Sequence, residues 1–153
     1  MSVLDSKIPP PVVGLAVAAM MWFATRLTPA LAFDLPAHGA IAVGFVIAGA
    51  LADLAGLVSF RRARTTINPL RPESSSALVT SGIYRFTRNP MYLGMLLILI
   101  GWGFWLSNGL ALALSAVLVA YLNRFQIGPE ERALSALFGR DFDDYRQRVR
   151  RWL

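Results

Sequence analysis

Four long apolar blocks, separated by short polar segments, constrain this chain more than any other feature of its sequence. The blocks run roughly over residues 12–33, 40–60, 90–106 and 110–127. A bilayer core is about 30 Å thick and an α-helix rises about 1.5 Å per residue, so about 20 apolar residues cross it. The blocks therefore predict an all-α membrane bundle of four spans, of which the last two are short.

The composition agrees with a membrane protein and argues against several kinds of site. Hydrophobic residues make up 56% of the chain and charged residues 16%, whereas a soluble domain has about 25% charged residues. There is no cysteine and a single histidine, His38, so we expect neither a thiolate nucleophile nor a metal site. The first block lacks a small-residue cleavage pattern followed by a polar domain, so we expect it to be retained as a span.

The net charge of +6 comes from arginines that border the apolar blocks. Because they form no separate basic domain, we do not expect nucleic-acid binding. Six arginines lie in residues 61–89 and six more after residue 129, whereas the turns at 34–39 and 107–109 contain no Lys or Arg. The positive-inside rule then places both termini on the cytoplasmic side of an inner, cytoplasmic membrane.

Two polar segments share that cytoplasmic face. Residues 65–89 form a 25-residue connection, and so long a loop in a small protein is usually functional. Gly128-Pro129 is expected to break the fourth helix, after which apolar residues recur every three or four positions to residue 153. This spacing predicts one amphipathic interfacial helix, or two that join at Gly139.

The sequence Arg88-Asn89-Pro90 predicts the start of the third span. Asn is a favoured N-cap and Pro is tolerated at the first helical position. The N–H groups and the positive dipole end of such a helix attract a carboxylate or a phosphate. Four side chains near this start suit such a ligand: Tyr84, Arg85, Arg88 and Tyr92.

Glu130-Glu131 allows two interpretations. Acids in the first turn of a helix offset its dipole, which stabilises the helix by roughly 0.3–1 kcal/mol each. Alternatively, one carboxylate accepts hydrogen bonds from a hydroxyl or ammonium group of a ligand.

The glycines of the third span also allow two interpretations. Gly101 and Gly103 suit close packing of membrane helices. Alternatively, Gly94 and Gly101, seven residues apart on one helix face, leave a slot where a ligand approaches the backbone.

Two ionisable residues, Arg26 and Asp53, interrupt the first two blocks. We expect Arg26 to extend towards the interface. The two differ in depth by roughly 10 Å, so we do not expect them to pair. An ionisable residue within a span indicates a functional role by default, and Asp53 is the better candidate.

The residues from Leu78 to Gly94, LVTSGIYRFTRNPMYLG, closely resemble the GxYrxxRHPxYxG signature of the isoprenylcysteine carboxyl methyltransferase and phospholipid methyltransferase superfamily. Thr66-Ile67-Asn68-Pro69 resembles its upstream T-x-N-P element. The tail resembles the family's EExxLxxxFGxxYxxYxxxV ending, and Gly101-Trp102-Gly103 with Glu130-Glu131 resembles the GxG and EE cofactor motifs of phosphatidylethanolamine N-methyltransferases. The resemblance covers roughly residues 60–153.

The resemblance implies an integral membrane methyltransferase that uses S-adenosylmethionine and releases S-adenosylhomocysteine. The acceptor would be hydrophobic or lipid-like, either an isoprenylcysteine-type carboxylate or an aminophospholipid, and the sequence does not separate the two. We expect one domain over residues 1–153, in which residues 1–60 form a two-helix hairpin and residues 61–153 form the cofactor-binding half. The rival interpretation is a non-catalytic four-span protein, such as a small transporter or an assembly subunit.

The resemblance assigns cofactor binding on the cytoplasmic side and no catalytic residue. Asn89 replaces the family's histidine, which leaves hydrogen bonding but no ionisable imidazole, and Phe142 replaces a common tyrosine. The expected cofactor-binding residues are Tyr84, Arg85, Arg88, Asn89, Tyr92, Gly94, Gly101, Gly103, Glu130 and Glu131.

Overall fold

The computed structural model describes residues 8–63 and 77–153, and the Thr66–Pro69 element lies outside them. Its α-helices are α1 (Pro10–Leu27), α2 (His38–Ala63), α3 (Pro90–Leu106), α4 (Gly109–Leu122), α5 (Gly128–Phe138) and α6 (Arg140–Arg148). Two short 3₁₀ turns, η1 (Pro29–Leu31) and η3 (Gly82–Arg85), and a π-helical turn, η4 (Asn123–Ile127), complete the elements. The described residues contain no β-strand, so the predicted all-α class is confirmed.

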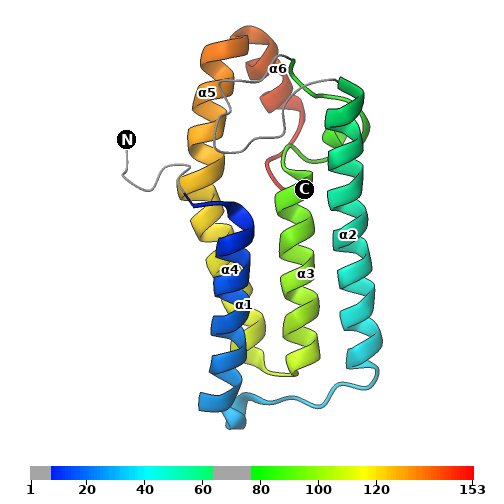
Figure 1. The fold of residues 1–153 in the computed structure, drawn as a ribbon, viewed down its shortest axis with the longest axis vertical. Helices are drawn as coiled ribbons and strands as arrows, with labels where there is room; N and C mark the ends of the chain where they lie inside the picture. The colour runs from blue at the N-terminus through cyan, green and yellow to red at the C-terminus, as the bar shows by residue number, and fades with distance from the viewer. Residues whose placement is uncertain (1–7, 64–76) are drawn as a thin grey trace.

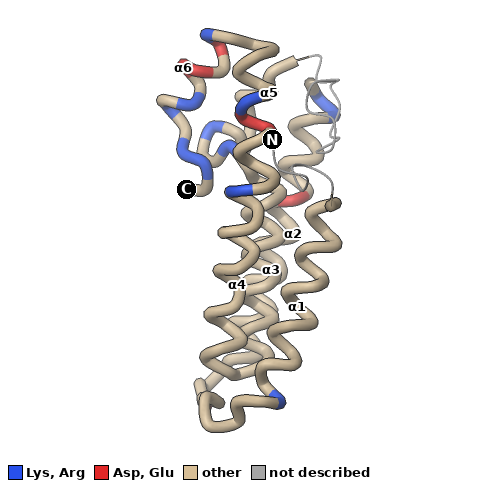
Figure 2. Tube along the Cα trace, turned by 90° about the vertical axis from the view of Figure 1, so that its left-hand side faces the viewer, with Lys and Arg blue, Asp and Glu red and all other residues tan. Residues whose placement is uncertain are grey.

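The four apolar helices run side by side along the long axis of the molecule (Figure 1). Helix α2 packs mainly on α3, α1 packs mainly on α4, and α3 contacts both α1 and α4. The α1–α2 connection and the α3–α4 turn lie at one end, and η3, α5, α6 and the C-terminus lie at the other. We call the latter the polar end, because most charged residues gather there (Figure 2).

Length and composition allow three described helical stretches to cross a membrane: Pro10–Leu27, His38–Ala63 and the continuous stretch Gly109–Phe138. Helix α3 is apolar but has only 17 residues. The outer faces of the bundle carry large apolar side chains, for example Leu15, Leu51 and Leu54, which are 73%, 60% and 55% exposed. Exposed apolar surface of this extent marks contact with a membrane or with protein, and the helix lengths fit a membrane, so the predicted all-α membrane bundle is confirmed.

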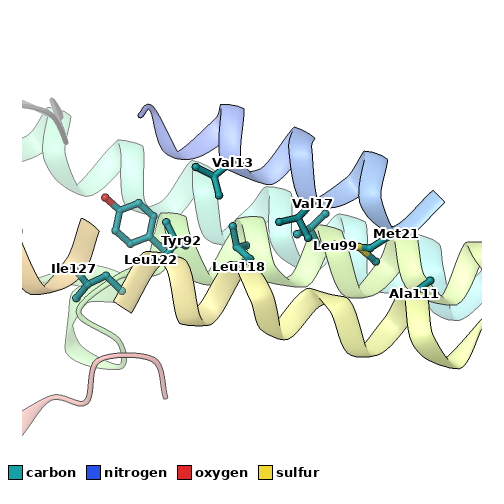
Figure 3. Close-up of a cluster of buried hydrophobic side chains, with 9 residues drawn as sticks. All are labelled: Val13, Val17, Met21, Tyr92, Leu99, Ala111, Leu118, Leu122 and Ile127. Carbon is teal, nitrogen blue, oxygen red and sulfur yellow. The ribbon is translucent and has the colours of Figure 1, made fainter. Parts of the chain in front are cut away.

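Buried side chains from α1, α3, α4 and η4 form the core (Figure 3). Met21, Leu118, Leu122 and Ile127 are fully enclosed. The remaining members are Val13, Val17, Tyr92, Leu99 and Ala111. Tyr92 is at the polar end of this core, which places its hydroxyl near α5.

The structure corrects two predicted helix ends. Helix α1 stops at Leu27, before the predicted end at residue 33, because Pro29 disfavours helical geometry at the preceding Thr28. Helix α2 begins at His38, within the predicted turn, and continues to Ala63. Arg61 and Arg62 therefore lie in its last turn, where cations suit the helix dipole.

The predicted break at Gly128-Pro129 is wrong. Residues 109–138 form one continuous helical stretch, and the π-helical turn η4 precedes the proline. The Gly128 N–H bonds to the carbonyl of Asn123, five residues back. This wider turn fits a proline, which has no N–H and would clash in a regular α-helix. The predicted joint at Gly139 is confirmed, with a φ of 53°.

The predicted amphipathic helix does not reach residue 153. Helix α6 ends at Arg148, and the last five residues are not helical. We call residues 149–153 the C-terminal segment. It lies against the start of α3, where Arg88 N donates to the Arg150 carbonyl at 3.0 Å.

Candidate functional site

Helix α3 starts at Pro90, as predicted, but the Asn89 side chain accepts no hydrogen bond from the first N–H groups of the helix and so does not cap it. The Asn89 amide donates instead from Nδ2 to the carbonyl of Arg151, at 2.9 Å. The hydroxyl of Thr87 accepts a hydrogen bond from Asn89 N at 3.1 Å. The amide of Asn89 thus joins α3 to the C-terminal segment, so the capping prediction is wrong for this side chain.

Both acids of the Glu130-Glu131 pair reach the start of α3. The Tyr92 hydroxyl donates a short hydrogen bond to Oε1 of Glu130, and Gln126 Nε2 lies 3.4 Å from the same oxygen. Glu131 Oε1 lies 3.0 Å from Nη2 of Arg88. These contacts between helices go beyond compensation of the α5 dipole, because they connect α5 to α3.

Arg151 is the second cation on Glu131. Its Nη2 donates to Oε2 at 2.6 Å and its Nε donates to Oε1 at 3.1 Å. The bond between the planar guanidinium and both carboxylate oxygens is the strong, oriented form of an ion pair. The described residues therefore place one carboxylate between two arginines.

The side chain of Arg88 is 10% exposed, and its Nε and Nη1 are buried without a partner among the described residues. Burial lowers the pKa of this guanidinium, while the nearby Glu131 carboxylate raises it. Arginine nevertheless stays protonated in proteins. A buried cation with two unpaired N–H groups suits an anionic group of a ligand.

Tyr84 and Tyr145 are buried side by side at the polar end. The Tyr145 hydroxyl donates to the backbone carbonyl of Tyr84 at 2.7 Å, and the Tyr84 ring stands edge-on to Phe60. Burial raises the pKa of both phenols, so both stay neutral. Arg85, on the same turn as Tyr84, is exposed.

The three candidate glycines lie at contacts between helices. A Cβ atom on Gly94 would lie 2.7 Å from the Gly49 carbonyl of α2. One on Gly101 would lie 2.8 Å from the Ala42 carbonyl, and one on Gly103 would lie 3.0 Å from the Cα of Leu112 in α4. Gly101 is nine residues along α3 from Tyr92, about 14 Å. The structure thus shows packing at these glycines and does not bring Gly101 and Gly103 to the acidic pair, so their cofactor role stays a prediction.

Four residues of the site were missed in the sequence: Asn123, Gln126, Arg151 and Trp152. Asn123 and Gln126 precede Glu130 at steps of three and four, which places all three on one helix face at the end of an apolar block. That polar stripe is a signal that sequence reasoning can use. Trp152 gave no such signal: its Nε1 donates to Asn123 Oδ1 at 3.1 Å, a contact that requires the chain to return.

An apolar groove of about 390 Å³ lies between α1, α2 and α3. On α2, the carboxyl group of Asp53 lies against Gly94, and its Oδ1 is buried without a partner among the described residues. Asp53 is seven residues, or about two turns, from the groove residue Val46 on the same helix face. The groove is lined by Ala18, Ala42, Val43, Val46, Ile47, Ile98, Leu99, Gly101, Trp102 and Trp105.

Comparison with known families shows the family to which the chain belongs. The phospholipid methyltransferase family matches residues 37–141, which contain all ten candidate residues and the whole of α2 to α5. The chain belongs to this family. No solved structure matches the chain.

Curated relatives of this family member carry methyltransferase names. Protein-S-isoprenylcysteine O-methyltransferase B of Arabidopsis thaliana is 32% identical over 104 residues, which is 68% of this chain and 53% of that protein. The Schizosaccharomyces pombe protein-S-isoprenylcysteine O-methyltransferase is 27% identical over 71% of this chain and 46% of its own. The chain thus spans about half the length of the named methyltransferases it matches. An uncharacterized protein of Haemophilus influenzae is 46% identical over 41% of this chain and 100% of its own.

Proposed function

We propose that this member of the phospholipid methyltransferase family is an integral membrane methyltransferase. It transfers a methyl group from S-adenosylmethionine to a hydrophobic or lipid-like acceptor and releases S-adenosylhomocysteine. The observation that carries this proposal is the buried Arg88, whose Nε and Nη1 have no partner among the described residues and which lies beside the acidic pair at the polar end. Family membership and the names of the relatives support the reaction class.

The chemistry of the polar end fits the polar groups of the donor. Either Nε or Nη1 of Arg88 can donate to the methionyl carboxylate, in a charge-assisted hydrogen bond. Glu130, held by Tyr92, suits a ribose hydroxyl or the ammonium group. Tyr84, Arg85 and Asn89 surround the start of α3 and belong to the same proposed site.

For methyl transfer the protein mainly has to position the donor and the acceptor and to exclude water from the site. S-adenosylmethionine supplies an electrophilic methyl group on a sulfonium when bound. The residues of the polar end orient the donor and keep the site dry, and in an in-line displacement these effects supply most of the rate. A carboxylate acceptor needs no base, and an amine acceptor only has to be neutral. We therefore assign no catalytic base.

The groove between α1 and α2 supports a lipid-like acceptor. Its lining is apolar, and outward-facing residues such as Val43 and Ile47 border it, so an apolar chain reaches it from the bilayer. Its members Ile98 and Leu99 lie four to five residues along α3 from Gly94, about 6–8 Å towards the far end of the bundle. We propose that the acceptor enters laterally and keeps its reactive head near the polar end.

We further propose that the bundle spans the inner membrane and that its polar end lies on the cytoplasmic side. Apart from Arg26 in the last turn of α1, at the opposite end, the arginines of the described residues gather at this end (Figure 2), and the positive-inside rule retains such an end on the cytoplasmic side. The polar donor then arrives from the cytoplasm and the acceptor from the bilayer.

The test supplies the donor with a labelled methyl group to the full chain in lipid nanodiscs. The acceptors are phosphatidylethanolamine, a farnesylated cysteine derivative and a total lipid extract. We expect label in the lipid product of the wild type and a strong loss in Arg88→Gln. Base-stable label identifies N-methylation, and base-labile label identifies a methyl ester. No labelled product from any acceptor contradicts the proposal and favours the non-catalytic four-span alternative.

A further inference from the structure

The C-terminal segment supplies a charge to the proposed donor site, although it lies outside the residues matched by the family. Arg151 occupies both oxygens of Glu131, at 2.6 and 3.1 Å. Arg88 reaches the same carboxylate only through Nη2, at 3.0 Å. The Nε and Nη1 of Arg88 are the groups left buried without a partner among the described residues.

The charges of these three side chains decide what the cluster attracts. Arg88 and Glu131 alone form a neutral pair, which has little attraction for an anion. With Arg151 the three side chains sum to one positive charge, which suits a single carboxylate. The Glu130 carboxylate faces Tyr92 and Gln126 instead. Apart from burial, the charged side chains that shift the pKa of Arg88 are Glu131, which raises it, and Arg151 and Arg146, which lower it.

Arg151 is fixed on both sides. Its carbonyl accepts hydrogen bonds from Asn89 Nδ2 at 2.9 Å and from Thr87 Oγ1 at 3.3 Å. Its Nη1 lies 3.4 Å from Asn123 Oδ1, which also accepts from the Trp152 indole. A solvated surface arginine has no such set of partners.

We propose that Arg151 is a positioning residue for donor recognition. It holds the Glu131 carboxylate, so that Arg88 keeps two N–H groups and a net positive charge for the carboxylate of the methyl donor. This inference rests on the proposed function. It adds a specificity element for the amino-acid part of the donor that the family match does not include.

The test compares two nucleosides that differ only in this carboxylate. S-adenosylhomocysteine and its decarboxylated analogue are titrated against the full chain in detergent, as wild type, Arg151→Gln and Arg151→Lys. Arg148→Gln is the matched control, because it removes one positive charge from an exposed tail residue whose side chain donates to the Asp144 carbonyl within α6. Thermal unfolding of every variant monitors the fold.

We expect Arg151→Gln to bind S-adenosylhomocysteine about tenfold more weakly and the decarboxylated analogue with unchanged affinity. Arg151→Lys should recover part of the loss, since lysine keeps the charge but not the planar fork. Arg148→Gln should match the wild type with both nucleosides.

An equal loss for both nucleosides would show that Arg151 only holds the fold, and no loss for either would also overturn the inference. If Arg151→Gln fails to fold, Arg151→Lys decides. It must lose more affinity for S-adenosylhomocysteine than for the decarboxylated analogue, and an equal loss or no loss would overturn the inference. A folded wild type that binds neither nucleoside overturns the proposed function itself, which is a distinguishable result.

Discussion

The hydroxyl of Tyr92 on α3 donates a hydrogen bond to Oε1 of Glu130 on α5. Tyr92 belongs to the buried core, and Glu130 lies just beyond the π-helical turn that ends the fourth apolar block. This bond therefore joins the core of the bundle to the polar end. It fixes one acid of the pair while Arg88 and Arg151 fix the other.

Tyr92→Phe should destabilise the protein by about 1–3 kcal/mol, because it leaves a buried carboxylate oxygen without its hydroxyl donor. Thermal unfolding in detergent measures the effect. Tyr121→Phe is the matched control, since the Tyr121 hydroxyl is buried without a partner among the described residues. It should cost almost nothing. Equal shifts for the two variants would show that the bond to Glu130 is not stabilising.

Gly94→Ala should separate α2 from α3. The new Cβ would lie 2.7 Å from the Gly49 carbonyl and would also meet the carboxyl group of Asp53, so we expect a cost of about 1–3 kcal/mol. Gly44→Ala in α2 is the control, because its Cβ meets nothing within 4 Å and alanine favours a helix by up to about 1 kcal/mol. Chemical unfolding in micelles compares them. A Gly94→Ala variant as stable as Gly44→Ala would contradict the close contact of α2 and α3.

Ile47→Trp should obstruct the apolar groove, which Ile47 lines. We expect the KM for a long-chain acceptor to rise by about tenfold while the affinity for S-adenosylhomocysteine stays constant. Leu51→Trp, also on an exposed position of α2 but outside the groove, should behave as the wild type. An unchanged KM in Ile47→Trp would remove the groove from the acceptor path.

The orientation is testable because the chain has no cysteine of its own. Asp34→Cys and Arg140→Cys place single thiols on exposed residues at opposite ends of the bundle. A membrane-impermeant maleimide applied to intact bacterial cells should label Asp34→Cys, whereas Arg140→Cys should react only after lysis. The reverse pattern would place the polar end outside the cytoplasm.

The sequence predicts the features that depend on local pattern. The apolar blocks, the start of α3 at Pro90 and the joint at Gly139 follow from length, proline geometry and the freedom of glycine at positive φ. The sequence also predicts that the acidic pair and Arg88 belong to one site, because the positive-inside rule places the start of the third span and the tail on the same face. The structure then brings Arg88 and Glu131 within 3.0 Å.

The features that were missed depend on contacts far apart in sequence. The side chain of Asn89 donates to the carbonyl of Arg151, 62 residues away, and no local pattern shows that it does this instead of capping α3. The π-helical turn before Pro129 buries Gln126 and Ile127 completely, and a local proline rule contains no such packing. The spacing of Gly94 and Gly101 predicts that they share one face of α3. Only the position of α2 shows that this face is packed against a neighbouring helix.

The most direct test of the donor site at the polar end is calorimetric titration of S-adenosylhomocysteine into the full chain in detergent, as wild type, Arg88→Gln and the exposed control Arg140→Gln. We expect saturable binding to the wild type and to Arg140→Gln, and about tenfold or greater weakening in a folded Arg88→Gln. Absence of binding to the folded wild type at about 1 mM nucleoside, or undiminished affinity in Arg88→Gln, would contradict the proposed donor site.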